Sequence, residues 1–294
     1  MKCLITGING VVGSNIASAL REVYGWEVIG LGSSQKIDNY YFRADLTHEN
    51  DVIRVSEEIN FCDIVIHCAA IIDFKCEPAN LFKMNIIGSI NALKIAKNVG
   101  AKSFINISSI PVIGRILKTP ITESHICAPN TGYHLSKLQA EQVIDFYSGS
   151  EIRAVSLRIP SPVGLGMPPR SFLPIILGQA IRNEDIKIVG DKRRRQNFLD
   201  LRDLVRAIVN LSEKNHVRGM YNIAAQKTIS NLDLALAILK QSNSKSKLLD
   251  LTEESSGYFE DWDVDCIKAY KDFGYAPKYE IFDSIDWILS RETS

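Results

Sequence analysis

The sequence predicts an α/β fold in which a doubly wound parallel sheet carries helices on both faces and a smaller C-terminal lobe follows. Short apolar segments alternate with segments of helical spacing up to Pro160, a pattern typical of parallel sheets with helical crossovers. A glycine-rich turn links the first apolar segment to the first helical one. Beyond Pro160, prolines and glycines interrupt the alternation and shorter elements follow, which indicates the second lobe.

Strands of the sheet are expected where branched aliphatic residues cluster in short runs, at residues 2–6, 27–31, 63–67, 103–107 and 151–159. Helices are expected at residues 12–23, 81–98 and 132–147, because apolar side chains recur there at helical spacing. In the second lobe, helices are expected at 175–183, 203–212 and 231–240, and strands at 186–189 and 220–223. The predicted domains are residues 1–160 and 161–294, with some later elements returning to the first domain.

The chain of 294 residues is long enough to bury a full core, and its composition narrows the class of partner. Lys and Arg number 34, as do Asp and Glu, so the zero net charge gives no general argument for nucleic acid or an anionic membrane. No apolar run approaches the roughly 20 residues of a membrane helix, and glycines break the N-terminal stretch too early for a signal peptide. The six cysteines form no Cys-x-x-Cys pair, which favours free thiols and a cytoplasmic location, and no metal site is expected.

The segment 6–13 has glycines at positions 7, 10 and 13, directly between a predicted strand and a predicted helix. Glycines allow a tight turn and let the backbone approach a pyrophosphate without a Cβ clash. The helix N-terminus then offers free N–H groups to the phosphates. This context predicts a dinucleotide cradle formed by Gly7, Ile8, Asn9, Gly10, Val11, Val12 and Gly13, and the alternative is a glycine turn without a ligand.

The residues after the second predicted strand bear on the choice between NAD and NADP. A carboxylate at this point usually bonds the adenosine ribose and repels a 2′-phosphate. Here Gly32, Ser33, Ser34 and Lys36 follow the strand, so hydroxyls and an ammonium replace the carboxylate. We therefore expect NADP rather than NAD; if Lys36 is instead a solvated loop residue, the cofactor is NAD.

Tyr133 and Lys137 are four residues apart on a predicted helix and therefore share one face. A free phenol has a pKa of about 10, and a nearby ammonium together with an oxidised nicotinamide favours the phenolate. Lowering this pKa by about 3 units requires roughly 4 kcal/mol, which two cations in a partly dry cleft can supply. Ser108 and Ser109 end a predicted strand, where α/β active sites gather, and His67 is expected to be a hydrogen-bonded strand-end residue. The pattern predicts a nicotinamide-dependent enzyme that acts on an alcohol or ketone.

These motifs resemble the extended short-chain dehydrogenase/reductase family, and within it the NAD-dependent epimerase/dehydratase branch that acts on nucleotide sugars. The matching segments are Thr-Gly-x-x-Gly-x-x-Gly at 6–13, Asp45-Leu46, His-x-Ala-Ala at 67–70, Asn85-x-x-Gly88, Ser108-Ser109, Tyr133-x-x-x-Lys137, Arg158-x-x-Ser161-Pro162-x-Gly164 and residues 190–203. The resemblance covers nearly the whole chain and implies a Rossmann-type sheet with a substrate-binding lobe. It also implies a homodimer formed through the helices at 81–98 and 132–147.

The resemblance implies a role for each position that matches a family motif. The catalytic residues would be Ser109, Tyr133 and Lys137. Beyond the glycine turn and the residues after the second strand, the cofactor would contact Asp45, Leu46, Cys68, Ala69, Ala70, Asn85, Ile107, Ser108, Tyr133, Lys137, Ile159 and Pro160. The substrate would contact Ser109, Ser161, Phe172, Arg194 and Gln196.

Two departures from the family pattern concern the substrate diphosphate. Ser161 replaces an Asn that holds it, and Gln196 replaces an Arg that clamps it. The missing charge would come from Arg194 or from its neighbours Lys192, Arg193 and Arg195, unless this run is only a solvated face. A third departure concerns the reaction: Ile110-Pro111 follows Ser109 where 4,6-dehydratases carry Asp-Glu, which argues against dehydration.

By resemblance, the expected reaction is hydride transfer at a carbon of a sugar nucleotide. Tyr133 would remove the hydroxyl proton, Ser109 would position the oxygen, and Lys137 would hold the nicotinamide ribose and lower the pKa of the tyrosine. The first hypothesis is a 4-epimerase type, in which hydride returns to the other face of a keto intermediate. The alternatives are an NADPH-dependent keto-sugar reductase and a non-catalytic cofactor-binding protein of the same fold.

Overall fold

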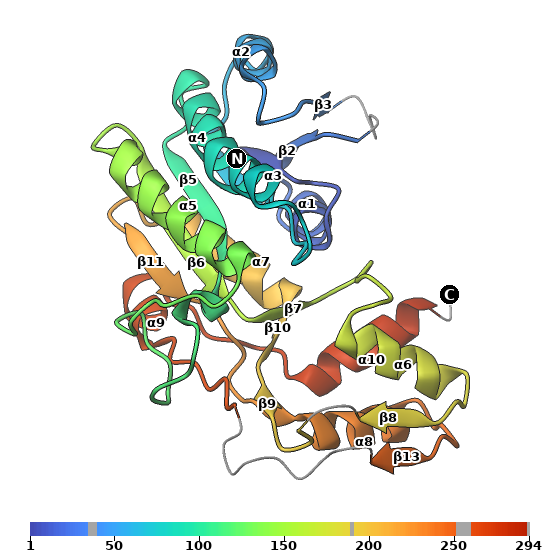
Figure 1. Ribbon diagram of the computed structural model, residues 1–294. Coiled ribbons are helices and arrows are strands. Elements are labelled where there is room, and N and C mark those ends of the chain that lie inside the picture. The colour runs from blue at the N-terminus through green and yellow to red at the C-terminus, as the bar shows by residue number, and fades with distance from the viewer. Residues whose placement is uncertain (35–39, 189–190, 251–259, 293–294) are drawn as a thin grey trace.

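The computed structural model describes residues 1–34, 40–188, 191–250 and 260–292. Within them, a seven-stranded parallel sheet with the order β11-β6-β5-β4-β1-β2-β3 forms the centre of the molecule (Figure 1). Its strands are β1 (Lys2–Thr6), β2 (Glu27–Gly32), β3 (Tyr41–Arg43), β4 (Ile64–His67), β5 (Ser103–Ser109), β6 (Arg153–Ile159) and β11 (Gly219–Asn222). The predicted doubly wound parallel sheet is confirmed, and it brings the carboxyl ends of β1, β4 and β5 together.

Helices cover both faces of this sheet. They are α1 (Val11–Glu22), α2 (Glu49–Glu58), α3 (Pro78–Phe82), a π-helical turn η1 (Lys83–Ile87), α4 (Gly88–Asn98), a 3-10 turn η2 (Ile110–Ile113), α5 (Gly132–Ser148), α7 (Leu201–Ser212) and α9 (Ile267–Phe273). Successive strand residues point to opposite faces, so Leu4 and Ile5 of β1 enter different cores. The core around Ile5 packs against α1, α7 and α9, and the core around Leu4 packs against α2, α4 and α5.

The C-terminal part of the chain builds a further core beside the sheet (Figure 1). Its elements are β7 (Ser161–Val163), α6 (Phe172–Ile181), β8 (Ile186–Ile188), β9 (Arg195–Gln196), β10 (Phe198–Asp200), β12 (Ile229–Ser230), α8 (Asn231–Gln241), β13 (Leu248–Asp250) and α10 (Ile281–Glu292). Buried side chains of α6, α8 and α10 pack together in it. In contrast, β11 joins the main sheet and α7 packs into one of its cores, so the chain returns to the sheet after leaving it.

The predicted strands and helices of the sheet are present with shifted ends. β5 continues to Ser109 because it pairs with β6 as far as Ile159, and the helix predicted at 81–98 begins at Pro78 and contains η1. The apolar pattern did not predict β3, α2, α9 or α10, nor the two- and three-residue strands β7, β9, β10, β12 and β13. β3 has only three residues, and α2 buries only Val52 and Val55 among charged neighbours, so neither produces a strong apolar pattern.

Two expectations from composition concern membranes and cysteines. Among the described helices, none combines the length and the apolar character that crossing a membrane requires. All six cysteines are free, as predicted; Cys3 and Cys62 are buried and the others are half-buried. Burial raises the pKa of both Cys3 and Cys62, which keeps these two thiols protonated and unreactive.

Candidate active site

The glycine turn joins β1 to α1 and is held tightly against the end of β4. Gly7 has a φ of +66°, and a Cβ on it would lie 2.6 Å from the Ala69 backbone nitrogen. A Cβ on Gly13 would lie 2.4 Å from the Gly7 carbonyl oxygen, so both positions require glycine. Gly10 caps α1 without a side-chain hydrogen bond, and no acidic residue occupies the first turn of this described helix. Its backbone N–H groups can therefore bind an anion, and the turn fits a pyrophosphate.

The loop after β2 adjoins the turn where the adenosine ribose of a dinucleotide would lie. Its two serines are held by their neighbours. The Asn9 amide donates to the Ser34 hydroxyl, and the Tyr41 hydroxyl donates to the Ser34 carbonyl at 3.1 Å. Arg43 Nε donates to the Ser33 carbonyl at 3.3 Å. The two serines of this loop and Arg43 of β3 thus bring hydroxyls and a guanidinium together at this end of the site.

Arg43 is a cation at this end of the site that no sequence pattern indicated. It lies opposite Gly32 in the parallel register of β2 and β3, and its side chain is exposed. Only this strand pairing brings it beside the serines, and a strand as short as β3 has little sequence signal. Lys36, which was expected to hold a phosphate, lies outside the described residues.

Asp45 and Leu46, which were expected near the adenine, follow β3. Asp45 Oδ1 accepts from the Thr47 backbone N–H at 2.8 Å, and Oδ2 lies 3.5 Å from His48 Nδ1. Leu46 is buried, and its carbonyl accepts from the Asn91 amide at 2.7 Å. These contacts fix the turn between β3 and α2, and a contact of either residue with the cofactor stays a prediction.

Tyr133 and Lys137 lie one turn apart in α5, near the ends of the central strands. Lys137 is 3% exposed, and burial lowers its pKa to about 8, while Glu141 and Cys68 act against this shift. Burial raises the pKa of Tyr133 to about 12. In the chain without cofactor, burial alone sets the direction of this shift. The expectation that Lys137 and an oxidised nicotinamide together lower the pKa of Tyr133 stays a prediction.

A buried ion pair lies one turn beyond Lys137. Arg158 of β6 donates to Glu141 from Nη2 at 2.7 Å and from Nε at 3.0 Å, and both side chains are 2% exposed. The Ser108 hydroxyl also donates to Glu141, so it is not available to a cofactor, and a contact through the Ser108 backbone stays a prediction. Ser109 follows it in β5 and is half-buried, so the end of the strand presents this second hydroxyl.

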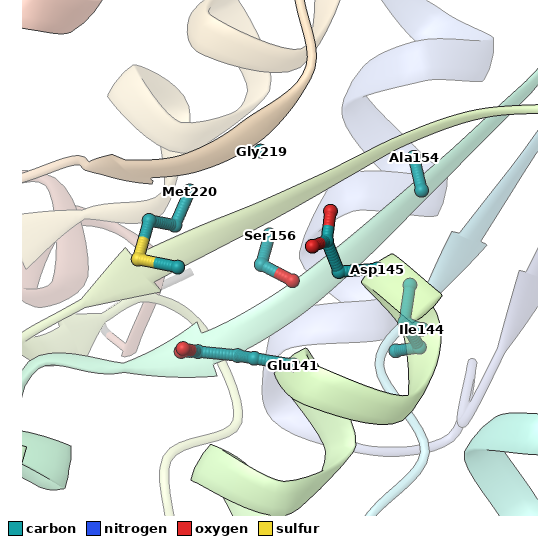
Figure 2. A pocket seen from close by; sticks show the side chains of 7 residues that line it. All are labelled: Glu141, Ile144, Asp145, Ala154, Ser156, Gly219 and Met220. Carbon is teal, nitrogen blue, oxygen red and sulfur yellow. The ribbon is translucent and has the colours of Figure 1, made fainter. Parts of the chain in front are cut away.

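Glu141 also borders a cavity of about 20 Å³ beneath α5 (Figure 2). The other residues around it are Ile144, Asp145, Ala154, Ser156, Gly219 and Met220, which come from α5, β6 and β11. This volume is enough for one water molecule and far too small for a dinucleotide or a sugar. The cavity is therefore not a ligand site.

Asn85 joins the loop after β4 to α5. Its Oδ1 accepts from the Ile71 backbone N–H at 2.8 Å, and its Nδ2 donates to the Ile71 carbonyl at 3.1 Å and to the Ser136 hydroxyl at 2.9 Å. Asn85 is 1% exposed, and both its amide oxygen and its amide nitrogen form hydrogen bonds within the protein. Asn85 therefore acts on the site by fixing this loop, and a direct contact with the cofactor stays a prediction.

His67 is fully buried at the end of β4. Its ring nitrogens bond to the hydroxyls of Thr6 at 2.7 Å and Ser89 at 2.9 Å, and burial lowers its pKa to about 3. The prediction of a hydrogen-bonded strand-end histidine is confirmed. The remaining expected cofactor residues are buried or half-buried around the strand ends; they are Cys68, Ala69, Ala70, Ile107, Ile159 and Pro160.

The residues expected to bind the substrate diphosphate lie in the C-terminal lobe and already have partners. Arg194 Nε donates to Glu260 at 2.8 Å, and the Gln196 amide donates to the Asn231 side-chain oxygen at 2.6 Å. Arg195, the neighbour considered for the same task, donates to the Thr228 hydroxyl and lies 3.8 Å from Asp261. Ser161 is exposed at the start of β7, and Phe172 packs against the C-terminal core. Their contact with a substrate stays a prediction.

A parallel sheet with a phosphate-binding turn after its first strand defines the class of dinucleotide-binding α/β proteins. Residues 3–224 match the family described as "NAD dependent epimerase/dehydratase family", and the chain belongs to it. It is a family of enzymes that includes epimerases and dehydratases of nucleotide sugars.

Curated relatives within this family differ in reaction. The chain is 26% identical to a dTDP-D-glucose 4,6-dehydratase of Dictyostelium discoideum over 82% of its own length and 62% of that relative. It is 22% identical to the low-salt glycan biosynthesis protein Agl12 of Haloferax volcanii, over 97% of this chain and 96% of that protein. It is 25% identical to UDP-glucuronic acid decarboxylase 1 of Arabidopsis thaliana, over 99% of this chain and 69% of that protein.

Solved structures show the same fold. UDP-glucose 4-epimerase of Thermotoga maritima, crystallised with UDP-glucose, superposes with a TM-score of 0.89 at 24% identity, over 100% of this chain and 99% of that chain. RMD from Pseudomonas aeruginosa, complexed with NADPH, superposes with a TM-score of 0.84 at 23% identity, over 98% and 97%. At these identities the likeness establishes the fold, and it leaves the reaction and the choice between NAD and NADP to the site.

Proposed function

We propose that the protein catalyses hydride transfer between a nicotinamide cofactor and a sugar carbon of a nucleotide sugar, with 4-epimerisation as the first candidate reaction. The observation that carries this proposal is the pairing on α5 of half-buried Tyr133 with buried Lys137, beside strand ends where a glycine turn can hold a pyrophosphate. The nicotinamide, when bound, supplies the acceptor and donor of hydride. The known substrates of relatives support a nucleotide sugar as the substrate class.

In this proposal, three polar residues act on the reacting groups: Ser109 at the end of β5, and Tyr133 and Lys137 on α5. The Ser109 hydroxyl donates a hydrogen bond to the reacting oxygen and fixes its position. The Tyr133 hydroxyl exchanges a proton with the same oxygen. Lys137 binds the ribose of the cofactor and places a positive charge near the phenol, which favours the phenolate. Since burial alone raises the pKa of Tyr133 to about 12, the phenol needs added positive charge to act as a base near neutral pH.

The residues after Ser109 argue against dehydration, although several relatives are dehydratases. Ile110 and Pro111 begin η2, and Ile110 is fully buried. Elimination of water requires an acid and a base beside the sugar, and neither residue offers a titratable group.

A second candidate, NADPH-dependent reduction of a keto sugar, is favoured by the loop after β2. Ser33, Ser34 and Arg43 provide hydroxyls and a guanidinium where a carboxylate would repel a 2′-phosphate. Net reduction consumes the cofactor at each turnover, and cells keep NADPH for reductions of this kind. A homodimer also stays part of the proposal, since η1 and α5 expose the apolar side chains of Ile87, Leu135 and Phe146.

An assay with two kinds of substrate separates the candidates. The purified protein is incubated with UDP-glucose or dTDP-glucose without added cofactor, and the sugar products are resolved by chromatography. It is then mixed with NADPH and a 4-keto sugar nucleotide, and absorbance at the nicotinamide band is followed. Formation of the 4-epimer without added cofactor supports the epimerase, and steady NADPH consumption supports the reductase. Binding of neither cofactor nor sugar nucleotide would contradict the proposal.

Replacing Arg43 with alanine is expected to weaken NADPH binding by about ten- to hundredfold, because a charge-assisted contact with a phosphate contributes roughly 1.5–3 kcal/mol. NADH binding should change little. The measurement is the dissociation constant of each cofactor by fluorescence titration, repeated with 2′,5′-ADP and 5′-AMP. Arg182→Ala is the control, since Arg182 pairs with Glu184 on the surface of the C-terminal lobe. Equal effects on NADPH and NADH would show that Arg43 does not bind the 2′-phosphate.

A further inference from the structure

The loop after β4 carries an exposed aromatic ring that touches the proposed catalytic tyrosine. Phe74 is 65% exposed, yet its ring centroid lies 5.9 Å from that of Tyr133 in an edge-to-face arrangement at 79°. It also lies 6.0 Å from the ring of His134, which is 5.1 Å from the ring of Tyr133. The three rings therefore form one cluster, and its outer member is left to solvent.

The loop that carries this ring is anchored rather than free. The Asn85 side chain fixes Ile71 of this loop by two hydrogen bonds to the Ile71 backbone and links the loop to Ser136 of α5. Beyond Phe74 the chain turns back, with the Asp73 carboxylate accepting from the Lys75 backbone N–H at 2.9 Å. The hydrogen bonds of the loop backbone thus place Phe74 beside Tyr133, although most of the Phe74 ring is exposed to solvent.

The ring of His134 is also fixed in place. His134 bonds through Nδ1 to the Thr131 hydroxyl at 2.8 Å, and the same hydroxyl accepts from the His134 backbone N–H at the start of α5. Burial lowers the pKa of His134, so the imidazole is neutral at pH 7. The cluster therefore presents an uncharged aromatic wall next to the Tyr133 hydroxyl.

We propose that Phe74 is a specificity-determining residue whose ring contacts the C–H face of the sugar while Tyr133 holds the reacting oxygen. This inference rests on the proposed function, because it assigns a contact within the same site. Ligand sites combine apolar walls with a few polar groups that fix orientation, and Ser109 and Tyr133 supply the polar groups here. A large ring exposed beside a reactive hydroxyl loses its contact with water when a sugar covers it, which favours binding.

The test compares a sugar nucleotide with the nucleotide that lacks the sugar. Dissociation constants of UDP-glucose, UDP, dTDP-glucose and dTDP are measured by calorimetry on the full chain saturated with NADP⁺. In Phe74→Ala, binding of the sugar nucleotide that wild type prefers should weaken about tenfold, while binding of its nucleotide stays within twofold. Phe74→Tyr should restore most of the loss. Phe61→Ala is the matched control, since Phe61 is 43% exposed before β4, at the other end of that strand.

Several outcomes would overturn the inference. Unchanged binding of the sugar nucleotide in Phe74→Ala would show that the ring makes no contact with the sugar. An equal loss for sugar nucleotide and nucleotide would assign the ring to the nucleotide instead. A change in sedimentation coefficient without a change in binding would make the ring a contact between two copies of the chain. If wild type binds NADP⁺ but none of the four probes, the proposed substrate class fails and this inference fails with it.

Discussion

Tyr133→Phe is expected to lower kcat by about 10²- to 10⁴-fold, because the variant cannot transfer a proton to or from the reacting oxygen. The change removes one oxygen atom and leaves the aromatic ring in contact with Phe74 and His134. Cofactor dissociation constants should therefore stay within twofold of wild type. The measurement is the rate of turnover in whichever assay above detects activity, together with a fluorescence titration of NADPH.

Tyr147→Phe is the control for this variant, since Tyr147 is 54% exposed at the far end of the same helix. It should leave turnover and cofactor binding as they are in wild type. Turnover by Tyr133→Phe at the wild-type rate would remove the proposed mechanism. A large loss of cofactor binding would instead assign the phenol to holding the cofactor.

Glu141→Gln is expected to destabilise the protein by about 3–5 kcal/mol, the usual cost of removing one partner of a buried ion pair. The carboxylate accepts hydrogen bonds from Arg158 and Ser108, and its negative charge acts to raise the pKa of Lys137. Burial on its own lowers the pKa of Arg158, and Glu141 more than compensates for this. Without the carboxylate, two buried cations remain unmatched. The measurement is the free energy of unfolding in urea.

Two further variants make this result interpretable. Glu184→Gln removes an equally close ion pair on the surface, where Glu184 is 53% exposed, and should leave the unfolding transition in place. The double variant Glu141→Leu with Arg158→Met removes both charges and should recover much of the lost stability, because well-packed apolar side chains can replace a buried pair. A single variant as stable as wild type would show that the pair does not stabilise this core.

Much of the fold was predictable because the main strands are short aliphatic runs such as Ile64–His67, which carry their own signal. The glycine turn was predictable because glycines recur at positions 7, 10 and 13 between a strand and a helix. The structure explains two of them, since Gly7 and Gly13 have no room for a Cβ. β3 was missed because it has only three residues, and α2 because it buries only Val52 and Val55. Helix α10 was also missed, although its apolar residues pack into the C-terminal core.

Part of the geometry around the candidate site was predictable, and its electrostatics were less so. Motif spacing placed Tyr133 and Lys137 on one helix face, and the structure agrees. The raised pKa of Tyr133 in the chain without cofactor was not predictable, because it comes from burial, and burial depends on how the chain packs around α5. Arg43 and Phe74 were not predicted as site residues, because only the pairing of β3 brings Arg43 there and only the path of the loop after β4 brings Phe74 there.

The return of β11 to the main sheet affects how the protein can be made. β6 pairs with β5 on one side and with β11 on the other, and β11 is encoded only after much of the C-terminal lobe. During synthesis on the ribosome, the backbone N–H and C=O groups of β6 that later bond to β11 therefore stay unpaired until β11 has been made. An exposed strand edge of this kind promotes aggregation. The main sheet therefore does not form from the N-terminal part of the chain alone: a fragment cut after β6 would lack the edge strand β11.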